Sequence, residues 1–237
     1  MISTMAMGDA AKSQAVLDIL IVFAVSAAAF MLELAIADLL PWGEEGTGAL
    51  AVLAGAGTVL WLTVFRQRVL SSLGFKKPTR WWTVPIWVVS IFIAYMAAQA
   101  LLPTILAPFF DIPQPDFSRY GDISGNLFNA ASFAFLLLVT AAIPEEIVYR
   151  GFLIERLAYL FDGQRFSNVL AVLVQALIFG SIHFQWGIGG IVITVIMGMV
   201  WGFAFLWCGR NLWVVIIAHS TAHIALATVL YYSTPPA

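Results

Sequence analysis

The sequence predicts an all-α membrane protein, a polytopic bundle of about seven transmembrane helices forming one domain over residues 1–237. The first observation is composition: 62% of the residues are hydrophobic and 10% are charged. In soluble domains about 45–50% of the residues are apolar and about 25% are charged. This excludes a soluble enzyme, a nucleic-acid-binding protein and a disordered chain. The second is a series of apolar stretches near the length of about 20 residues that spans a bilayer. They lie at roughly 15–41, 48–65, 82–108, 130–158, 168–186, 188–208 and 212–232.

The basic residues predict the orientation, because cytoplasmic loops carry an excess of Lys and Arg. If the connection between the second and third stretches is cytoplasmic, ten of the eleven basic residues fall on the cytoplasmic side, and Arg119 alone falls outside. We therefore expect a cytoplasmic N-terminus and an external C-terminus. The ten are Lys12, Arg66, Arg68, Lys76, Lys77, Arg80, Arg150, Arg156, Arg165 and Arg210, of which Arg150 lies within the fourth stretch, toward its cytoplasmic end.

Ionisable residues inside these stretches are candidates for function, because each costs about 2.5–3.5 kcal/mol at the bilayer centre on insertion scales. In the first stretch, Asp18, Glu33 and Asp38 lie near helix ends or on faces from which they can snorkel, and we expect no function of them. Glu145 and Glu146 stand together in the fourth stretch. All three histidines also lie in apolar stretches: His183 in the fifth, and His219 and His223 in the seventh.

Helical spacing suggests different roles for the two glutamates. Residues four apart share a helix face, so Glu146 lies over Arg150 and Glu145 over Tyr149. A Glu146–Arg150 ion pair would neutralise two charges that are costly alone in the bilayer, which favours a structural role for both. Glu145 has no partner nearby in sequence and must be balanced by a histidine or a water. At about 1.5 Å of rise per residue, Glu145, His183 and His223 fall at similar depths.

These residue types can hydrolyse an amide bond. A carboxylate beside an imidazole can take a proton from water while the water attacks a carbonyl, and ring N–H groups of His219 and His223 can stabilise the oxyanion. Ser181 and Ser220 lie near His183 and His219 in sequence, but adjacent helical residues do not face each other. A serine triad is therefore disfavoured.

A zinc site is the alternative for the same residues. His219 and His223, at i and i+4, have the spacing of paired zinc ligands, and His183 and Glu145 would complete a tetrahedron. The sequence lacks the Glu that follows the first His in H-E-x-x-H, since Ser220 stands there. We favour a site without a cofactor and keep zinc as a possibility.

Three motifs resemble those of the CAAX protease and bacteriocin-processing family of intramembrane endopeptidases. Residues 145–150 (EEIVYR) resemble its E-E-x-x-x-R motif, residues 179–183 (FGSIH) its F-x-x-x-H motif, and residues 210–219 the approach to its third, histidine-containing motif. The resemblance covers residues 127–225, which we expect to form the catalytic core. It places the active site between the fourth, fifth and seventh helices.

The resemblance implies a role for each residue. Glu145 and His183 would activate water, Glu146 and Arg150 would form a structural ion pair, and His219 would belong to the oxyanion hole. His223 stands where the family has Asn, and its ring N–H can still donate.

The resemblance also implies an environment and a substrate. We expect a peptidase of the bacterial inner membrane, acting on a hydrophobic or lipidated peptide or protein at the lipid bilayer, with no nucleic-acid partner. Two other interpretations stay open: a non-catalytic immunity or scaffold protein, and a transporter or proton relay. No internal repeat of the kind that transporters show is evident, which weighs against the last.

Overall fold

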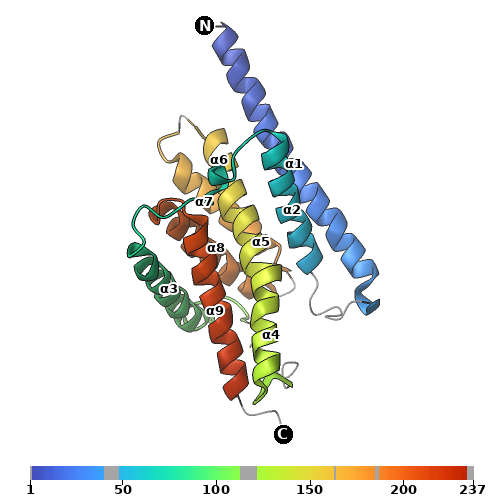
Figure 1. Ribbon diagram of the computed structural model, residues 1–237, viewed down its shortest axis with the longest axis vertical. Helices are drawn as coiled ribbons and strands as arrows, with labels where there is room; N and C mark the ends of the chain where they lie inside the picture. The colour runs from blue at the N-terminus through green and yellow to red at the C-terminus, as the bar shows by residue number, and fades with distance from the viewer. Residues whose placement is uncertain (1, 40–47, 113–121, 163, 185–186, 234–237) are drawn as a thin grey trace.

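The computed structural model describes residues 2–39, 48–112, 122–162, 164–184 and 187–233, and within them the protein is all-α, as predicted. Figure 1 shows a bundle in which the start of α1 and the end of α9 lie at opposite ends of the long axis. The helices are α1 (Ile2–Ala35), α2 (Ala49–Phe65), α3 (Thr83–Leu106), a continuous helix over Leu127–Leu160 that contains α4, α5 and α6, α7 (Ser167–Ser181), α8 (Gly187–Trp207) and α9 (Leu212–Tyr232).

Each of the seven expected apolar stretches contains a helix, but only five of these helices are long and apolar enough to cross a membrane. The exceptions, α2 and α7, have 17 and 15 residues. At 1.5 Å per residue they extend about 26 and about 22 Å, less than the hydrocarbon core of about 30 Å. The prediction of an integral membrane protein is confirmed by the five long apolar helices. The two short helices are apolar but do not extend across the full thickness of the hydrocarbon core.

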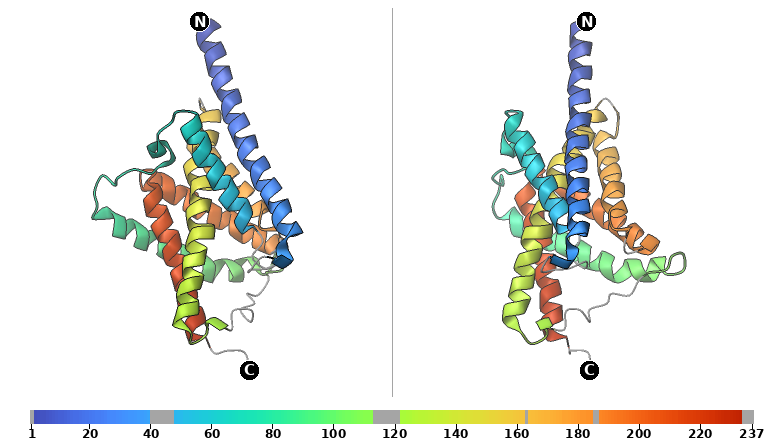
Figure 2. Two further views of the ribbon diagram at one scale, coloured as in Figure 1. Left: turned by 45° about the vertical axis from the view of Figure 1, so that its right-hand side comes forward. Right: turned by 90° about the vertical axis from the view of Figure 1, so that its right-hand side faces the viewer.

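The first helix begins earlier than predicted. α1 has 34 residues from Ile2, whereas the apolar stretch suggested a start near residue 15. Hydropathy marks where a helix meets lipid rather than where it begins, so polar residues such as Lys12 and Gln14 continue the helix beyond the apolar region. Both views in Figure 2 show this N-terminal part projecting beyond the other helices.

Two carboxylates of α1 have structural partners rather than snorkelling to solvent. Glu33 is fully buried, and it accepts hydrogen bonds from the backbone N–H groups of Gly48 (2.8 Å) and Leu50 (3.3 Å). A carboxylate there satisfies donors and complements the dipole at the start of α2. Asp18 is also fully buried, 3.2 Å from Arg66 and 3.7 Å from Arg156. Asp38 is exposed.

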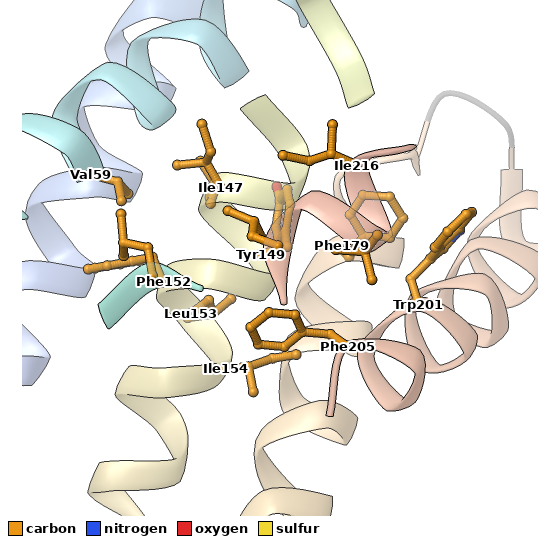
Figure 3. Packing of buried hydrophobic residues seen from close by; sticks show 14 of the residues in the cluster. Val59, Ile147, Tyr149, Phe152, Leu153, Ile154, Phe179, Trp201, Phe205 and Ile216 are labelled. Carbon is orange, nitrogen blue, oxygen red and sulfur yellow. The ribbon is translucent and has the colours of Figure 1, made fainter. Parts of the chain in front are cut away.

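Glycines allow α7 and α8 to pack closely as a hairpin. A Cβ added at Gly198 would lie 3.0 Å from the Cα of Ala176, and one at Gly202 would lie 2.8 Å from Val172. Gly198 and Gly202 are four residues apart and so form a small-residue packing face on α8, and α7 is the helix that this face contacts. Figure 3 shows Phe179 of α7 between Tyr149 and Trp201 of α8, with Ile216 of α9 above them.

The basic connections gather at one end of the bundle. The segment after α2 touches the α8–α9 corner, where the Leu212 N–H donates to the Gly74 carbonyl (2.9 Å). Arg210 at that corner pairs with Glu155 near the end of the Leu127–Leu160 helix. Arg119 lies outside the described residues. This end therefore carries most of the described positive charge, as expected of the side predicted to be cytoplasmic.

Candidate active site

The paired glutamates lie where the Leu127–Leu160 helix changes its geometry. π-Helical turns cover Leu138–Ala142 and Glu146–Ile154, and a short α-helical segment, Ile143–Glu145, separates them. Pro144 lies in that segment and has no backbone N–H, which disfavours regular α-helical hydrogen bonding around it. π-Helical turns are rare and frequently occur at functional sites. Every residue of Glu146–Ile154 is buried, so this polar motif lies inside the bundle.

Glu146 and Arg150 form an ion pair within the protein interior. Arg150 Nη1 lies 3.2 Å from Glu146 Oε1, and both side chains have 0% exposure. The guanidinium carbon of Arg150 also lies 4.9 Å from the centre of the Phe179 ring, a cation–π contact that gains strength when it is desolvated. Arg150 is thereby held between the carboxylate and α7.

The same carboxylate binds a histidine from α9. His219 Nδ1 lies 2.9 Å from Glu146 Oε1. An ionised carboxylate only accepts hydrogen bonds, so Nδ1 carries the proton and donates. In the neutral ring Nε2 is then an acceptor, and it donates only when both ring nitrogens are protonated. Glu146 thus fixes which atom of His219 faces the rest of the site.

His223 stacks on His219 one turn further along α9. The two ring centres are 4.7 Å apart with an interplanar angle of 29°. His223 Nε2 is buried and makes no hydrogen bond in the described part of the chain. On its other side His219 stacks on Trp201, with ring centres 5.1 Å apart. His223 therefore has a buried ring nitrogen with no hydrogen-bond partner among the described residues.

His183 lies in the turn after α7 rather than inside a helix, because α7 ends at Ser181. Its Nδ1 donates to the carbonyl of Phe179 (2.8 Å), one of the last carbonyls of a helix, which have no partner within the helix. This bond fixes the tautomer in which Nε2 is the acceptor. Phe179 contacts both His183 and Tyr149, each with ring centres 4.9 Å apart, and so connects this turn to the glutamate motif.

Glu145 differs from Glu146 in burial and in partners. It is half-buried, and within the described residues no hydrogen bond or ion pair joins its carboxylate to another side chain. The helix therefore carries one carboxylate that is held by two partners and one for which the described residues provide no such partner.

The structure does not bring the possible zinc ligands into one group. Among the described residues, no three His, Cys, Asp or Glu side chains are placed to hold a metal ion. Ser181 and Ser220 donate to the backbone carbonyls of Ile178 and Ile216. Their hydroxyls thus face their own helices, in keeping with the expectation against a serine triad.

Two aromatic residues of the site carried little signal in the sequence. Phe179 was visible as part of the F-x-x-x-H motif, but its contact with Arg150 was not. Trp201 is one of nine tryptophans in an apolar protein, and no spacing marks it as the neighbour of His219.

Comparison with protein families gives one match: residues 127–225 match the family described as type II CAAX prenyl endopeptidase Rce1-like. The match begins at the first residue of α4 and includes Glu145, Glu146, Arg150 and all three histidines. Neither curated proteins nor solved structures gave a match. The chain therefore carries a domain of the type II CAAX prenyl endopeptidase Rce1-like family over residues 127–225.

Proposed function

We propose that this protein is an intramembrane endopeptidase that hydrolyses hydrophobic or lipidated peptides by a metal-independent, glutamate-activated water. Membership of the Rce1-like family implies an intramembrane protease. One observation carries the mechanism: Glu146 is bound by both Arg150 and His219, which leaves Glu145 as the carboxylate available to act as a base. The active site then lies between the glutamate motif, the turn after α7, and α9.

Glu145 and His183 activate the water in this mechanism. His183 Nδ1 donates to the Phe179 carbonyl, so Nε2 accepts a hydrogen bond from the water and orients it. Glu145 takes the proton as the water oxygen attacks the peptide carbonyl, and later delivers it to the leaving amine. A general base needs to lie within hydrogen-bonding distance of its proton or act through one water, and such contacts often tighten only with substrate bound.

His223 and His219 stabilise the tetrahedral oxyanion. His223 offers Nε2, which has no hydrogen-bond partner among the described residues, and His219 adds a second donor when both of its nitrogens are protonated. Glu146, Arg150 and Trp201 hold His219 in position. Donors fixed in a water-poor site act on the developing charge without a reorganisation cost.

A cleavage assay with a chelator tests the reaction and its catalytic type together. The purified protein in detergent is incubated with a pool of hydrophobic and lipidated peptides, with and without a strong zinc chelator, and products are identified by mass spectrometry. We expect cleavage at the same rate under both conditions. Cleavage lost on chelation and restored by zinc would contradict the proposed mechanism and make His183, His219 and His223 ligands.

The N-terminus is predicted to be cytoplasmic and the C-terminus external. The basic residues at the end of the bundle formed by Arg66, Arg156 and Arg210 favour this orientation. The orientation is measured with reporters fused to each end of the full chain. One reporter is active only in the cytoplasm and the other only outside it. A cytoplasmic signal from the C-terminal fusion would reverse the assignment or show an even number of crossings.

A further inference from the structure

A polar cavity lies at the basic end of the bundle, outside the candidate active site. Its volume is about 230 Å³, and its lining includes Lys76, Lys77, Arg80, Cys208 and Asn211. The first turns of α3 and α9 line it, and α8 ends beside it. Three apolar helices thus begin or end here, which places the cavity at the boundary between the hydrocarbon and water.

The described lining of the cavity carries positive charge. Among its described lining residues there are three cations and no Asp or Glu, and none of these cations forms an ion pair within the described parts of the chain. The first turns of α3 and α9 contain no acidic residue, so both helices direct the positive ends of their dipoles at it. Burial raises the pKa of the Cys208 thiol, which stays neutral near pH 7. An anion is the ligand that this arrangement favours.

The loop that carries the lysines is fastened to α9. The Asn211 side-chain amide donates to the Lys76 carbonyl (2.9 Å), and the Leu212 N–H donates to the Gly74 carbonyl (2.9 Å). Gly74 has φ 96°, and an added Cβ would lie 2.7 Å from the Arg210 carbonyl oxygen. Only glycine permits this approach without strain. The backbone beneath the cations is therefore fixed before any ligand arrives.

Size and surroundings indicate the class of anion. Pockets for drug-sized ligands have about 300–1,000 Å³, so this cavity suits a small group rather than a folded peptide. Trp81 and Trp82, which separate the lining residues Arg80 and Thr83 in sequence, are 68% and 63% exposed, as expected of aromatic residues at a membrane interface. Basic pockets between transmembrane helices bind phosphate-bearing lipid headgroups.

We propose that this cavity binds a phosphate group at the membrane boundary, carried by an anionic lipid headgroup or free in solution. Lys76, Lys77 and Arg80 supply the charge, and the α8–α9 corner with the docked loop supplies the shape. This binding site is separate from peptide hydrolysis and does not depend on the proposed mechanism.

Native mass spectrometry of the full-length protein in detergent tests the proposal. Binding of phosphatidylglycerol is compared with binding of phosphatidylcholine, in the wild type and in the Lys76→Ala/Arg80→Ala variant. We expect tighter binding of phosphatidylglycerol in the wild type and about a 30-fold loss in the variant. Each basic residue near an anionic surface contributes about 1 kcal/mol to binding, so the variant loses about 2 kcal/mol. Because about 1.4 kcal/mol corresponds to a tenfold change in affinity, this loss is about 30-fold.

Two control variants separate this site from general charge effects. Arg165→Ala removes an exposed basic residue that does not line the cavity, and binding should persist. Lys76→Arg/Lys77→Arg keeps the charge and should also bind. Equal binding of both lipids by the wild type, or unchanged phosphatidylglycerol binding in Lys76→Ala/Arg80→Ala, would overturn the proposal.

A competition arm distinguishes the two sources of phosphate. Inorganic phosphate is added to the complex of the protein with phosphatidylglycerol. A chloride salt at the same ionic strength serves as the reference. Displacement by phosphate beyond the chloride reference supports a site that also takes the free anion. Displacement only by added phosphatidylglycerol supports the lipid headgroup as the ligand.

Discussion

Replacing Glu145 with glutamine is expected to lower the rate of peptide cleavage by about 10²- to 10⁴-fold, the usual contribution of a positioned general base or acid. The carboxamide keeps the shape of the side chain but does not accept the proton of the water. Glu145 is half-buried and holds no ion pair within the described residues, so the fold should be unaffected. The loss of cleavage is measured as kcat/KM for the peptide substrate. The stability of the fold is measured as the melting temperature in the same detergent.

The matched control for this variant is Asp162→Asn. Asp162 is an exposed carboxylate just after the helix that carries Glu145, and its loss should leave both the rate and the melting temperature unchanged. A Glu145→Gln protein that cleaves at the wild-type rate would refute the base assignment, whatever its stability.

Replacing Arg150 with methionine is expected to reduce the free energy of unfolding by about 3–5 kcal/mol, the cost of removing one partner from a buried ion pair. Methionine fills most of the volume but leaves the Glu146 carboxylate with His219 as its remaining partner, at 0% exposure. The Phe179 ring loses its cation contact as well. Denaturant unfolding in detergent, followed by tryptophan fluorescence, measures the change.

A double variant separates the loss of the pair from the loss of packing. Glu146→Gln/Arg150→Met removes both charges, and it should be more stable than Arg150→Met alone because no uncompensated carboxylate remains. Arg165→Met, at an exposed position, should change stability by less than about 1 kcal/mol, as surface charges do. If Arg150→Met costs no more than Arg165→Met, the ion pair does not stabilise the fold.

The fold class followed from composition because lipid leaves a membrane protein few alternatives. Only helices and closed barrels satisfy every backbone hydrogen bond in hydrocarbon, and apolar stretches of about 20 residues indicate helices. Hydropathy could not show that α7 ends at Ser181, since Ile182 and Phe184 continue the apolar pattern. After the last residue of α7, His183 Nδ1 donates to the Phe179 carbonyl, and this contact depends on side-chain orientation.

Contacts within the helix were predictable and contacts between helices were not. The i, i+4 spacing placed Glu146 over Arg150, and the structure brings their charged atoms to 3.2 Å. That spacing carries no information on which glutamate faces α9, because helix rotation within a bundle is set by packing. For the same reason the sequence assigned no partner to Glu33, whose carboxylate binds the start of α2, or to His219, which binds Glu146 and stacks on Trp201.

The central claim is that the adjacent glutamates have different roles, with Glu145 as the catalytic base and Glu146 as a structural carboxylate. Side-by-side measurement of Glu145→Gln and Glu146→Gln tests this claim most directly. Each variant is assayed for kcat of peptide cleavage and for melting temperature in the same detergent. We expect Glu145→Gln to lose cleavage at an unchanged melting temperature, and Glu146→Gln to melt at a lower temperature, because Arg150 and His219 lose their shared carboxylate. Retained cleavage in Glu145→Gln, together with lost cleavage at an unchanged melting temperature in Glu146→Gln, would contradict the account and assign the base to Glu146.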